Sequence, residues 1–196
     1  MDFETRAIHE GQEPDPATGA VTVPIYQTST YVQEAVGEHR GYDYSRTANP
    51  TRRALELCLA SLESAEYGFG FSSGMGATTT IMHLVSPGDR IVAVDDVYGG
   101  TYRLFSKGYA PKGYEIDFVP HDEVAGAIDE RTRLVWLETP TNPLLNIVDI
   151  ASAAARMSIT FSNGFVGVSS QTMRVRSPRC SARLSVISDA GTHVNS

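Results

Sequence analysis

The chain has 196 residues, a mass of 21.2 kDa and a formal net charge of −7 at pH 7. Its hydrophobic content of 41% can supply a folded core, which excludes disorder along the whole length. The negative charge argues against a nucleic-acid partner, and no stretch has the roughly 18 apolar residues of a membrane-spanning helix. The acidic start lacks the apolar segment of a secretory signal, and Cys58 and Cys180 show no metal-ligand spacing, so we expect a cytoplasmic protein.

Charge and composition divide the chain unevenly. Residues 1–157 hold 12 basic and 22 acidic side chains, whereas residues 158–196 hold four arginines, one aspartate and nine serines. A turn-forming cluster at residues 14–19 predicts that residues 1–48 form an extended N-terminal arm with little core of its own. We therefore expect three parts: the arm, an α/β domain over residues 49–157, and a serine-rich, disordered tail over residues 158–196.

Helices and strands alternate after the arm. Asn49 can cap a helix that begins with Pro50, and an apolar stripe follows at Leu55, Cys58, Leu59 and Leu62, which assigns Cys58 to packing. Apolar runs predict strands at residues 67–71, 90–94, 115–119 and 134–137. Helices are predicted between them, at residues 75–85, 101–109 and 122–130.

This alternation predicts the fold class. Strands separated by helices indicate a parallel α/β sheet, with the strand at residues 90–94 buried on both faces. Ligands of such sheets bind at the carboxyl ends of the strands. The loops at residues 72–76, 95–100 and 138–143 all follow strands, so we expect them at this edge.

The first of these loops can bind a phosphate group. Gly74 and Gly76 let the backbone approach a ligand closely, and the following helix offers unpaired N–H groups and a positive dipole end. An ordinary strand–helix turn is the alternative interpretation. The histidines, at positions 9, 39, 83, 121 and 193, show no metal-ligand spacing, so no metal site is predicted.

The other candidates are an aromatic, an amide and an arginine. Tyr98 precedes two glycines and could lie flat on a planar ligand, or be a half-buried turn residue. Asn142 stands between two prolines that fix its backbone, although it could simply form the turn. Tyr44 and Arg46 lie in the arm; if the arm reaches a neighbouring subunit, Arg46 could pair with a phosphate there, and otherwise it is a solvated arginine.

A dinucleotide-binding site is a rival interpretation. Gly68, Gly70 and Gly74 give a GxGxxxG pattern, and Asp95 ends the next strand, where a ribose-binding carboxylate would be expected. Against this, Gly68 and Gly70 lie inside the predicted strand and the helix begins late. A Walker-type lysine is also missing, so nucleoside triphosphate chemistry has no support.

Several segments together resemble the cystathionine γ-synthase/γ-lyase family, the Cys/Met-metabolism branch of the fold-type I pyridoxal-phosphate enzymes. They occur in the family's order and spacing and cover residues 1–157. The matching segments are TRAIHEG at 5–11, TGAV at 18–21 with PI at 24–25, YDYSR at 42–46 with NPT at 49–51, SGMGA at 73–77, YGGTY at 98–102 and ETPTNP at 138–143.

The resemblance implies an incomplete fold-type I large domain, preceded by the extended arm, that binds pyridoxal 5′-phosphate. Ser73, Gly74 and Met75 match the phosphate-binding segment, with backbone amides from the latter two. Tyr98 matches the tyrosine that stacks on the cofactor ring and can relay protons; Asn142 matches the position near the ring hydroxyl, and Glu138 matches a supporting carboxylate. Tyr44 and Arg46 match the pair that a neighbouring subunit contributes to the phosphate.

The resemblance also implies the chemistry, which is γ-elimination or γ-replacement on homoserine esters and sulfur amino acids, with the cofactor as electron sink. The substrate is a small amino acid, and the assembly is a homo-oligomer, a dimer of dimers. Which of the family's reactions applies is left open by the sequence.

The family's Schiff-base lysine has no counterpart in this sequence. The two lysines, Lys107 and Lys112, lie outside the Ser-x-Thr-Lys context of that residue. Similarity stops near Met157, and the charge change there is what an out-of-frame reading would give. We therefore expect a truncated or frame-shifted family member that is inactive as this chain. A non-catalytic module that binds a phosphate ligand or a partner remains an alternative.

Overall fold

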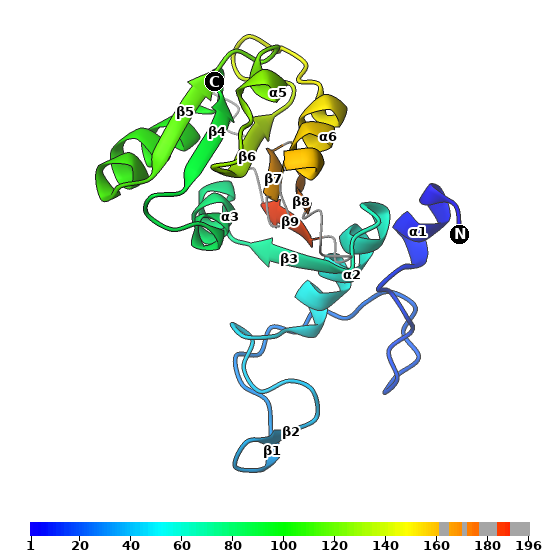
Figure 1. Cartoon of the computed structure of the whole chain (residues 1–196). Coiled ribbons are helices and arrows are strands. Elements are labelled where there is room, and N and C mark those ends of the chain that lie inside the picture. Colours follow the sequence, from blue (N-terminus) through cyan, green and yellow to red (C-terminus); the bar gives the residue numbers. More distant parts are fainter. Residues whose placement is uncertain (161–164, 170–171, 177–183, 189–196) are drawn as a thin grey trace, which may run out of the picture. The chain divides into compact units, whose positions relative to one another are not determined.

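The computed structural model describes residues 1–160, 165–169, 172–176 and 184–188. The chain divides into two compact units, residues 1–70 and 71–196 (Figure 1). Each unit is described separately below.

The first unit is built around one long helix, α2 (Pro50–Leu62). Asn49 caps it as predicted, because its side-chain oxygen accepts hydrogen bonds from the backbone N–H groups of Thr51 and Arg52. The other elements are a short helix, α1 (Phe3–His9), a hairpin of β1 (Gln33–Ala35) and β2 (Glu38–His39), and a strand, β3 (Tyr67–Phe71), which extends one residue beyond this unit.

Helix α1 covers part of the apolar stripe of α2. The Cys58 thiol lies 3.8 Å from the carbonyl oxygen of Ala7, so Cys58 packs against α1, but Leu55 is 50% exposed. Within residues 1–48, Asp15 is the only buried side chain. Its carboxylate accepts hydrogen bonds from the backbone of Ala17 and the Tyr26 hydroxyl. Polar turns therefore order this segment in place of an apolar core.

The second unit is a sheet with strands in the order β9-β8-β7-β6-β4-β5. The pairs β4–β5, β4–β6 and β6–β7 are parallel, while β7–β8 and β8–β9 are antiparallel. Its strands are β4 (Arg90–Val94), β5 (Glu115–Val119), β6 (Thr132–Glu138), β7 (Phe165–Ser169), β8 (Thr172–Arg176) and β9 (Leu184–Ser188). The predicted parallel α/β arrangement is confirmed for the strands near residues 90, 115 and 134.

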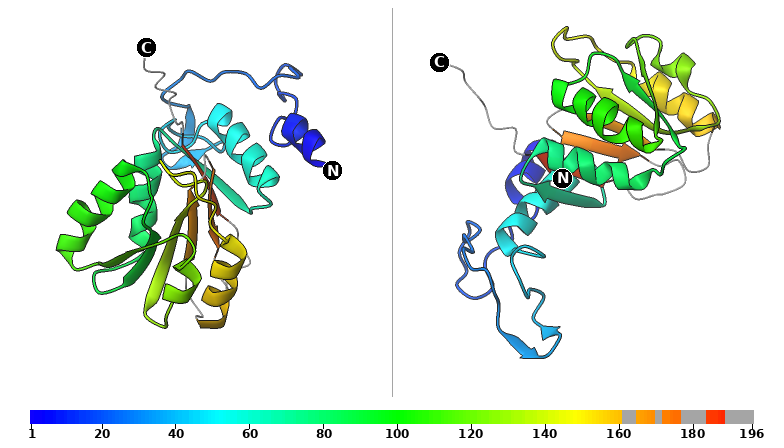
Figure 2. Two further views of the ribbon diagram at one scale, coloured as in Figure 1. Left: turned by 90° about the horizontal axis from the view of Figure 1, so that it is seen from above. Right: turned by 90° about the vertical axis from the view of Figure 1, so that its left-hand side faces the viewer.

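Helices cover both faces of this sheet. Helix α3 (Gly74–Ile81) continues into a 3₁₀ turn (Met82–Leu84), and α4 (Gly99–Arg103) continues into a π-helix, η2 (Leu104–Tyr109), and a 3₁₀ turn, η3 (Ala110–Lys112). Figure 2 shows α4 and η2 on one side of the sheet and α6 (Ile150–Thr160) on the other. Helix α5 (Val124–Ala127) is shorter than the predicted helix at 122–130.

The core lies where β4 and β6 run side by side. Every residue from Ile91 to Val94 and from Leu134 to Leu137 is fully buried, as a central parallel strand requires. Phe105 of η2 meets Trp136 edge-on, with ring centroids 5.4 Å apart. These contacts fix the positions of both strand ends and of the loops that follow them.

Part of the predicted tail has regular secondary structure. Helix α6 continues to Thr160, and β7, β8 and β9 lie within residues 165–188. The other residues of the predicted tail lie outside the described part of the chain, and an out-of-frame origin of residues 158–196 stays a prediction.

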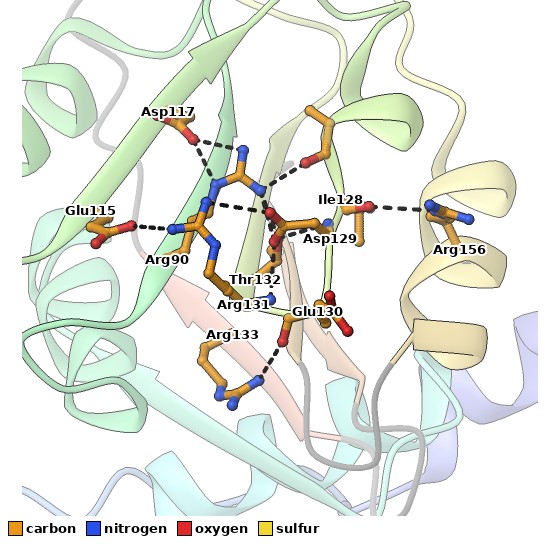
Figure 3. A network of polar contacts seen from close by, with 11 residues as sticks. Arg90, Glu115, Asp117, Ile128, Asp129, Glu130, Arg131, Thr132, Arg133 and Arg156 are labelled. Carbon is orange, nitrogen blue, oxygen red and sulfur yellow. Dashed lines mark hydrogen bonds and ion pairs between the residues drawn. The ribbon is translucent and has the colours of Figure 1, made fainter.

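A network of charges joins the amino ends of three strands (Figure 3). Arg90, whose side chain is 12% exposed, binds Asp117 on β5 at 2.7 Å and Asp129 before β6 at 3.0 Å. Its guanidinium also donates to the Thr132 hydroxyl at 3.0 Å and to the backbone carbonyl of Ala127 at 2.8 Å. The several N–H donors of the Arg90 guanidinium therefore connect β5, β4 and β6.

We expect Arg90→Met to lower the free energy of unfolding by about 1–3 kcal/mol, because it removes a nearly buried guanidinium and leaves the buried Thr132 hydroxyl and the half-buried Ala127 carbonyl without this donor. Arg131→Met is the matched control, since Arg131 also binds Asp129 but is 65% exposed, and its effect should stay within about 0.5 kcal/mol. Urea denaturation followed by circular dichroism measures both. Equal losses in the two variants would contradict the assignment.

Candidate functional site

The candidate site begins at the first turn of α3. Ser73 is the helix cap, and its hydroxyl oxygen accepts a hydrogen bond from the Gly76 N–H at 3.0 Å. The Ala77 N–H donates to the Ser73 carbonyl at 3.1 Å. The N–H groups of Gly74 and Met75 precede these bonds and have no partner in the part of the chain that the structure describes. They are therefore available to an anion at the positive end of the helix.

Tyr98 lies next to this turn. An ideal Cβ built on Gly100 would lie 2.4 Å from Cε1 of Tyr98 and 3.0 Å from Sδ of Met75. The Tyr98 ring and the Met75 side chain thus both approach Gly100 closely, at a position where only glycine leaves room for them. Tyr98 remains 54% exposed, so part of its ring is open to a ligand.

Glu138, at the end of β6, holds the start of α4. Its carboxylate is buried and accepts hydrogen bonds from the Tyr98 backbone N–H at 2.5 Å and the Thr101 hydroxyl at 2.8 Å. The Trp136 indole N–H donates to it at 3.2 Å. The predicted supporting carboxylate therefore positions the backbone of Tyr98.

Asn142 is placed by a loop bound to the end of β4. Its backbone N–H donates to the carbonyl of Asp96 at 3.2 Å, and its side chain is exposed. The Thr141 hydroxyl donates to the Asp96 carboxylate, which also accepts the Leu144 N–H at 2.9 Å. The peptide bonds before Pro140 and Pro143 are both cis. The loops carrying residues 73–75, Tyr98 and Asn142 are thus linked at one edge of the sheet, as predicted.

Tyr44 and Arg46 belong to the first unit, where they form an exposed pair. The Arg46 guanidinium donates to the Tyr44 hydroxyl at 3.1 Å, and its central carbon lies 5.0 Å from the centroid of the Tyr44 ring. Both side chains can therefore contact the same anion. Whether they contribute to the site of another copy stays a prediction.

The structure gives the glycines of the rival dinucleotide pattern another role. Gly68 and Gly70 lie inside β3, and an ideal Cβ on Gly68 would lie 2.3 Å from the carbonyl oxygen of Glu56. The Gly70 N–H donates to the Glu56 carboxylate at 2.9 Å. These glycines serve the packing of β3 on α2, so the dinucleotide interpretation loses the loop on which it depends.

Neither lysine lies among the site residues. Lys107 is exposed on the π-helix η2. Lys112 precedes Gly113, whose carbonyl accepts the Gly88 N–H at 2.7 Å just before β4 begins. Lys112 therefore lies near the amino ends of the strands, opposite the candidate site.

Comparison with known proteins gives a consistent picture. The profile of the Cys/Met metabolism PLP-dependent enzymes matches residues 4–161. The chain belongs to this family. It is 56% identical over 153 residues to a probable cystathionine gamma-synthase of Herpetosiphon aurantiacus, and 52% identical over 157 residues to a cystathionine gamma-lyase of Bacillus subtilis. These alignments cover 76% and 79% of this chain, but 48% and 41% of the two relatives.

Solved structures agree with the sequence relatives. The crystal structure of metB from Corynebacterium glutamicum matches with a TM-score of 0.81 and 43% identity, over 91% of this chain and 46% of that one. Cystathionine gamma-lyase from Lactobacillus plantarum, complexed with L-serine, matches with a TM-score of 0.79 and 42% identity, over 87% of this chain and 45% of that one. The chain thus spans about half the length of these relatives, and its fold is the corresponding part of a fold-type I enzyme.

The family's cofactor is pyridoxal 5′-phosphate, and the residues present fit its phosphate and ring. Two unpaired N–H groups at the start of α3 suit a phosphate, and the half-exposed ring of Tyr98 beside them suits a flat heterocycle. Within the described ranges there is no cluster of side chains that could hold a metal ion, and no helix is long and apolar enough to cross a membrane.

Sequence reasoning missed the residues that connect these loops. Asp96 lies outside the matching segments, and Thr101 and Thr141 lie inside them without an assigned role; each acts through a partner more than 30 positions away. Gly100 belongs to the YGGTY segment, but its close approach to Tyr98 and Met75 shows only in the folded chain. The pairing of strands could have suggested Asp96, since it follows β4 directly beside the end of β6.

We expect Gly100→Ala to displace the Tyr98 ring, because the added methyl group would overlap it and press on Met75. Gly99→Ala is the matched control, since an ideal Cβ on Gly99 has no atom within 4 Å. With methionine methyl groups labelled with ¹³C, the Met75 signal should shift in the first variant and stay in place in the second. An unchanged Met75 signal in both would show that the close contact is absent.

Proposed function

We propose that residues 71–157 bind pyridoxal 5′-phosphate at the edge formed by the turn at 73–75, Tyr98 and Asn142. The observation that supports this most directly is the convergence around Gly100 of a half-exposed aromatic ring and a helix start whose first two N–H groups have no partner among the described residues. The helix start would hold the phosphate through the N–H groups of Gly74 and Met75 and the Ser73 hydroxyl. Tyr98 would stack on the ring, and Asn142 would approach the ring hydroxyl.

The chemistry is that of enzymes acting on sulfur amino acids. The relatives are named cystathionine gamma-synthase, cystathionine beta-lyase and cystathionine gamma-lyase. We propose that the protein belongs among them and that its chemistry is γ-replacement or γ-elimination on a homoserine ester or a sulfur amino acid. When bound, the cofactor supplies an electron sink for such reactions. Tyr98, placed by Glu138, could hold or pass a proton at its hydroxyl.

This chain by itself is proposed to bind the cofactor without catalysis. A pyridoxal enzyme requires a lysine that attaches the cofactor, and the lysines of this sequence are Lys107 and Lys112. Lys112 lies near the opposite ends of the strands, and Lys107 is exposed on η2. Neither stands in the family's sequence context, so non-covalent binding is the function that the residues support.

The arm is proposed to complete the phosphate site of a second copy. Arg46 and Tyr44 are exposed and already bonded to one another, so they would present a cation and a phenol side by side to a phosphate. This proposal makes the functional unit a homo-oligomer, and we propose that it acts in the cytoplasm.

Binding can be measured with pyridoxamine 5′-phosphate, which is fluorescent and cannot attach to lysines. We expect saturable binding by the unaltered chain and a roughly three- to tenfold weaker affinity in Tyr98→Ala, because stacking on the ring is lost. Tyr102→Ala is the matched control: Tyr102 lies on α4, which directly follows Tyr98, and is 50% exposed, but packs on Phe118. Its affinity should equal that of the unaltered chain.

The same titration tests the arm. Arg46→Ala should weaken binding, whereas Arg40→Ala should not, since Arg40 is an exposed arginine of the arm paired with Glu34. Absence of saturable binding by the unaltered chain would refute the proposed function. Equal affinities of the unaltered chain and the Arg46 variant would refute only the contribution of the arm.

We expect no turnover by the chain alone. Incubation with pyridoxal 5′-phosphate and L-cystathionine should release no thiol beyond that released by the cofactor in buffer, because the attaching lysine is missing. Thiol release is followed with a disulfide reagent. Release that scales with protein concentration and disappears in the Lys107→Ala, Lys112→Ala double variant would contradict the proposal.

A further inference from the structure

Two carboxylates at the site each bind the loop that follows the neighbouring strand. Glu138 ends β6, and its oxygens accept hydrogen bonds from Tyr98 and Thr101, which follow β4. Asp96 follows β4, and its oxygens accept hydrogen bonds from the loop that follows β6. Each strand end therefore carries the acceptor for the loop of its neighbour.

Asp96 binds the backbone of Asn142 and also residues on both sides of it. The Thr141 hydroxyl and the Leu144 N–H donate to the same oxygen of the Asp96 carboxylate, Oδ2, and the Asn142 N–H donates to the Asp96 carbonyl. Thr141 is fully buried, and its hydroxyl oxygen accepts the Asn146 N–H at 2.8 Å. The backbone of Asn142 is thus bound to Asp96 itself and flanked by residues that Asp96 also binds.

We propose that Asp96 is a positioning residue that sets where the side chain of Asn142 meets the ring of the bound cofactor. The inference rests on the proposed function, because Asn142 is assigned to the ring only there. Asp96 acts through Thr141 and Leu144, and its role is to keep the exposed amide of Asn142 in one place.

The two carboxylates differ in a way that variants can reveal. Asp96 uses one oxygen for both side-chain bonds, so the single carbonyl oxygen of an asparagine can accept both. Glu138 uses both oxygens: Oε2 accepts from Tyr98, and Oε1 accepts from Thr101 and Trp136. A glutamine at 138 would set its NH₂ group against the N–H of either Tyr98 or Trp136. Asp96→Asn should therefore preserve the arrangement that Glu138→Gln loses.

The test compares two probes of different size, pyridoxamine 5′-phosphate and inorganic phosphate. Inorganic phosphate occupies only the anion site, where it competes with the phosphate group of pyridoxamine 5′-phosphate. In Asp96→Ala we expect the affinity for pyridoxamine 5′-phosphate to fall about three- to tenfold, the loss of about one ring hydrogen bond, with phosphate competition unchanged. Asp96→Asn should restore the affinity. Asp95→Ala is the matched control, because Asp95 is the neighbouring, exposed carboxylate. A structural loss alone would weaken both probes together.

Thr141→Val and Thr141→Ser give a second pair should Asp96→Ala not fold, since only serine keeps the hydroxyl that donates to Asp96. Amide hydrogen exchange at Asn142 should be faster in Asp96→Ala and Thr141→Val than in Asp96→Asn and Thr141→Ser. If the unaltered chain binds neither probe, the proposed function fails and the inference with it. A different result overturns the inference alone: the unaltered chain binds both probes, and Asp96→Ala and Thr141→Val leave the ratio of the two affinities, for pyridoxamine 5′-phosphate and for inorganic phosphate, unchanged.

Discussion

Parallel pairing of β4 with β6 is the constraint on which the rest of the second unit depends. Ile91 pairs with Leu134 and Ala93 with Trp136, and both strands are fully buried over these positions. Since the strands run in the same direction, the loops that follow them leave the sheet at the same edge. Asp96, Tyr98, Glu138 and Asn142 are close together because of this register, although about 40 residues separate the two loops.

The buried strands and the capped helix were predictable from local sequence. The runs at residues 90–94 and 115–119 match β4 and β5 to the residue, because an apolar or alternating run bounded by turns has few other solutions. Asn49 and Pro50 open α2 as expected. The edge that carries the candidate site followed from the order of strands and helices alone.

Other features depend on contacts that no local pattern reveals. The helix predicted at residues 122–130 shrinks to α5, because Asp129 is engaged by Arg90 and by the backbone of Arg131 before β6 begins. Burial acts to raise the pKa of Asp129, but hydrogen bonds from Arg131 and Thr132, together with the charge of Arg90, outweigh it and lower the pKa below 3.8. Likewise, Asp96 shows its importance only once Thr141 lies beside it.

The Arg90 network lies at the amino ends of the strands whose carboxyl ends carry the candidate site. Cohesion of the sheet and recognition of a ligand therefore draw on separate sets of side chains, divided by the buried length of β4 and β6. Substitutions around Arg90 can therefore change the stability of the sheet without contacting the residues of the candidate site. The same separation gives protein engineers a place to strengthen the sheet without altering the candidate site.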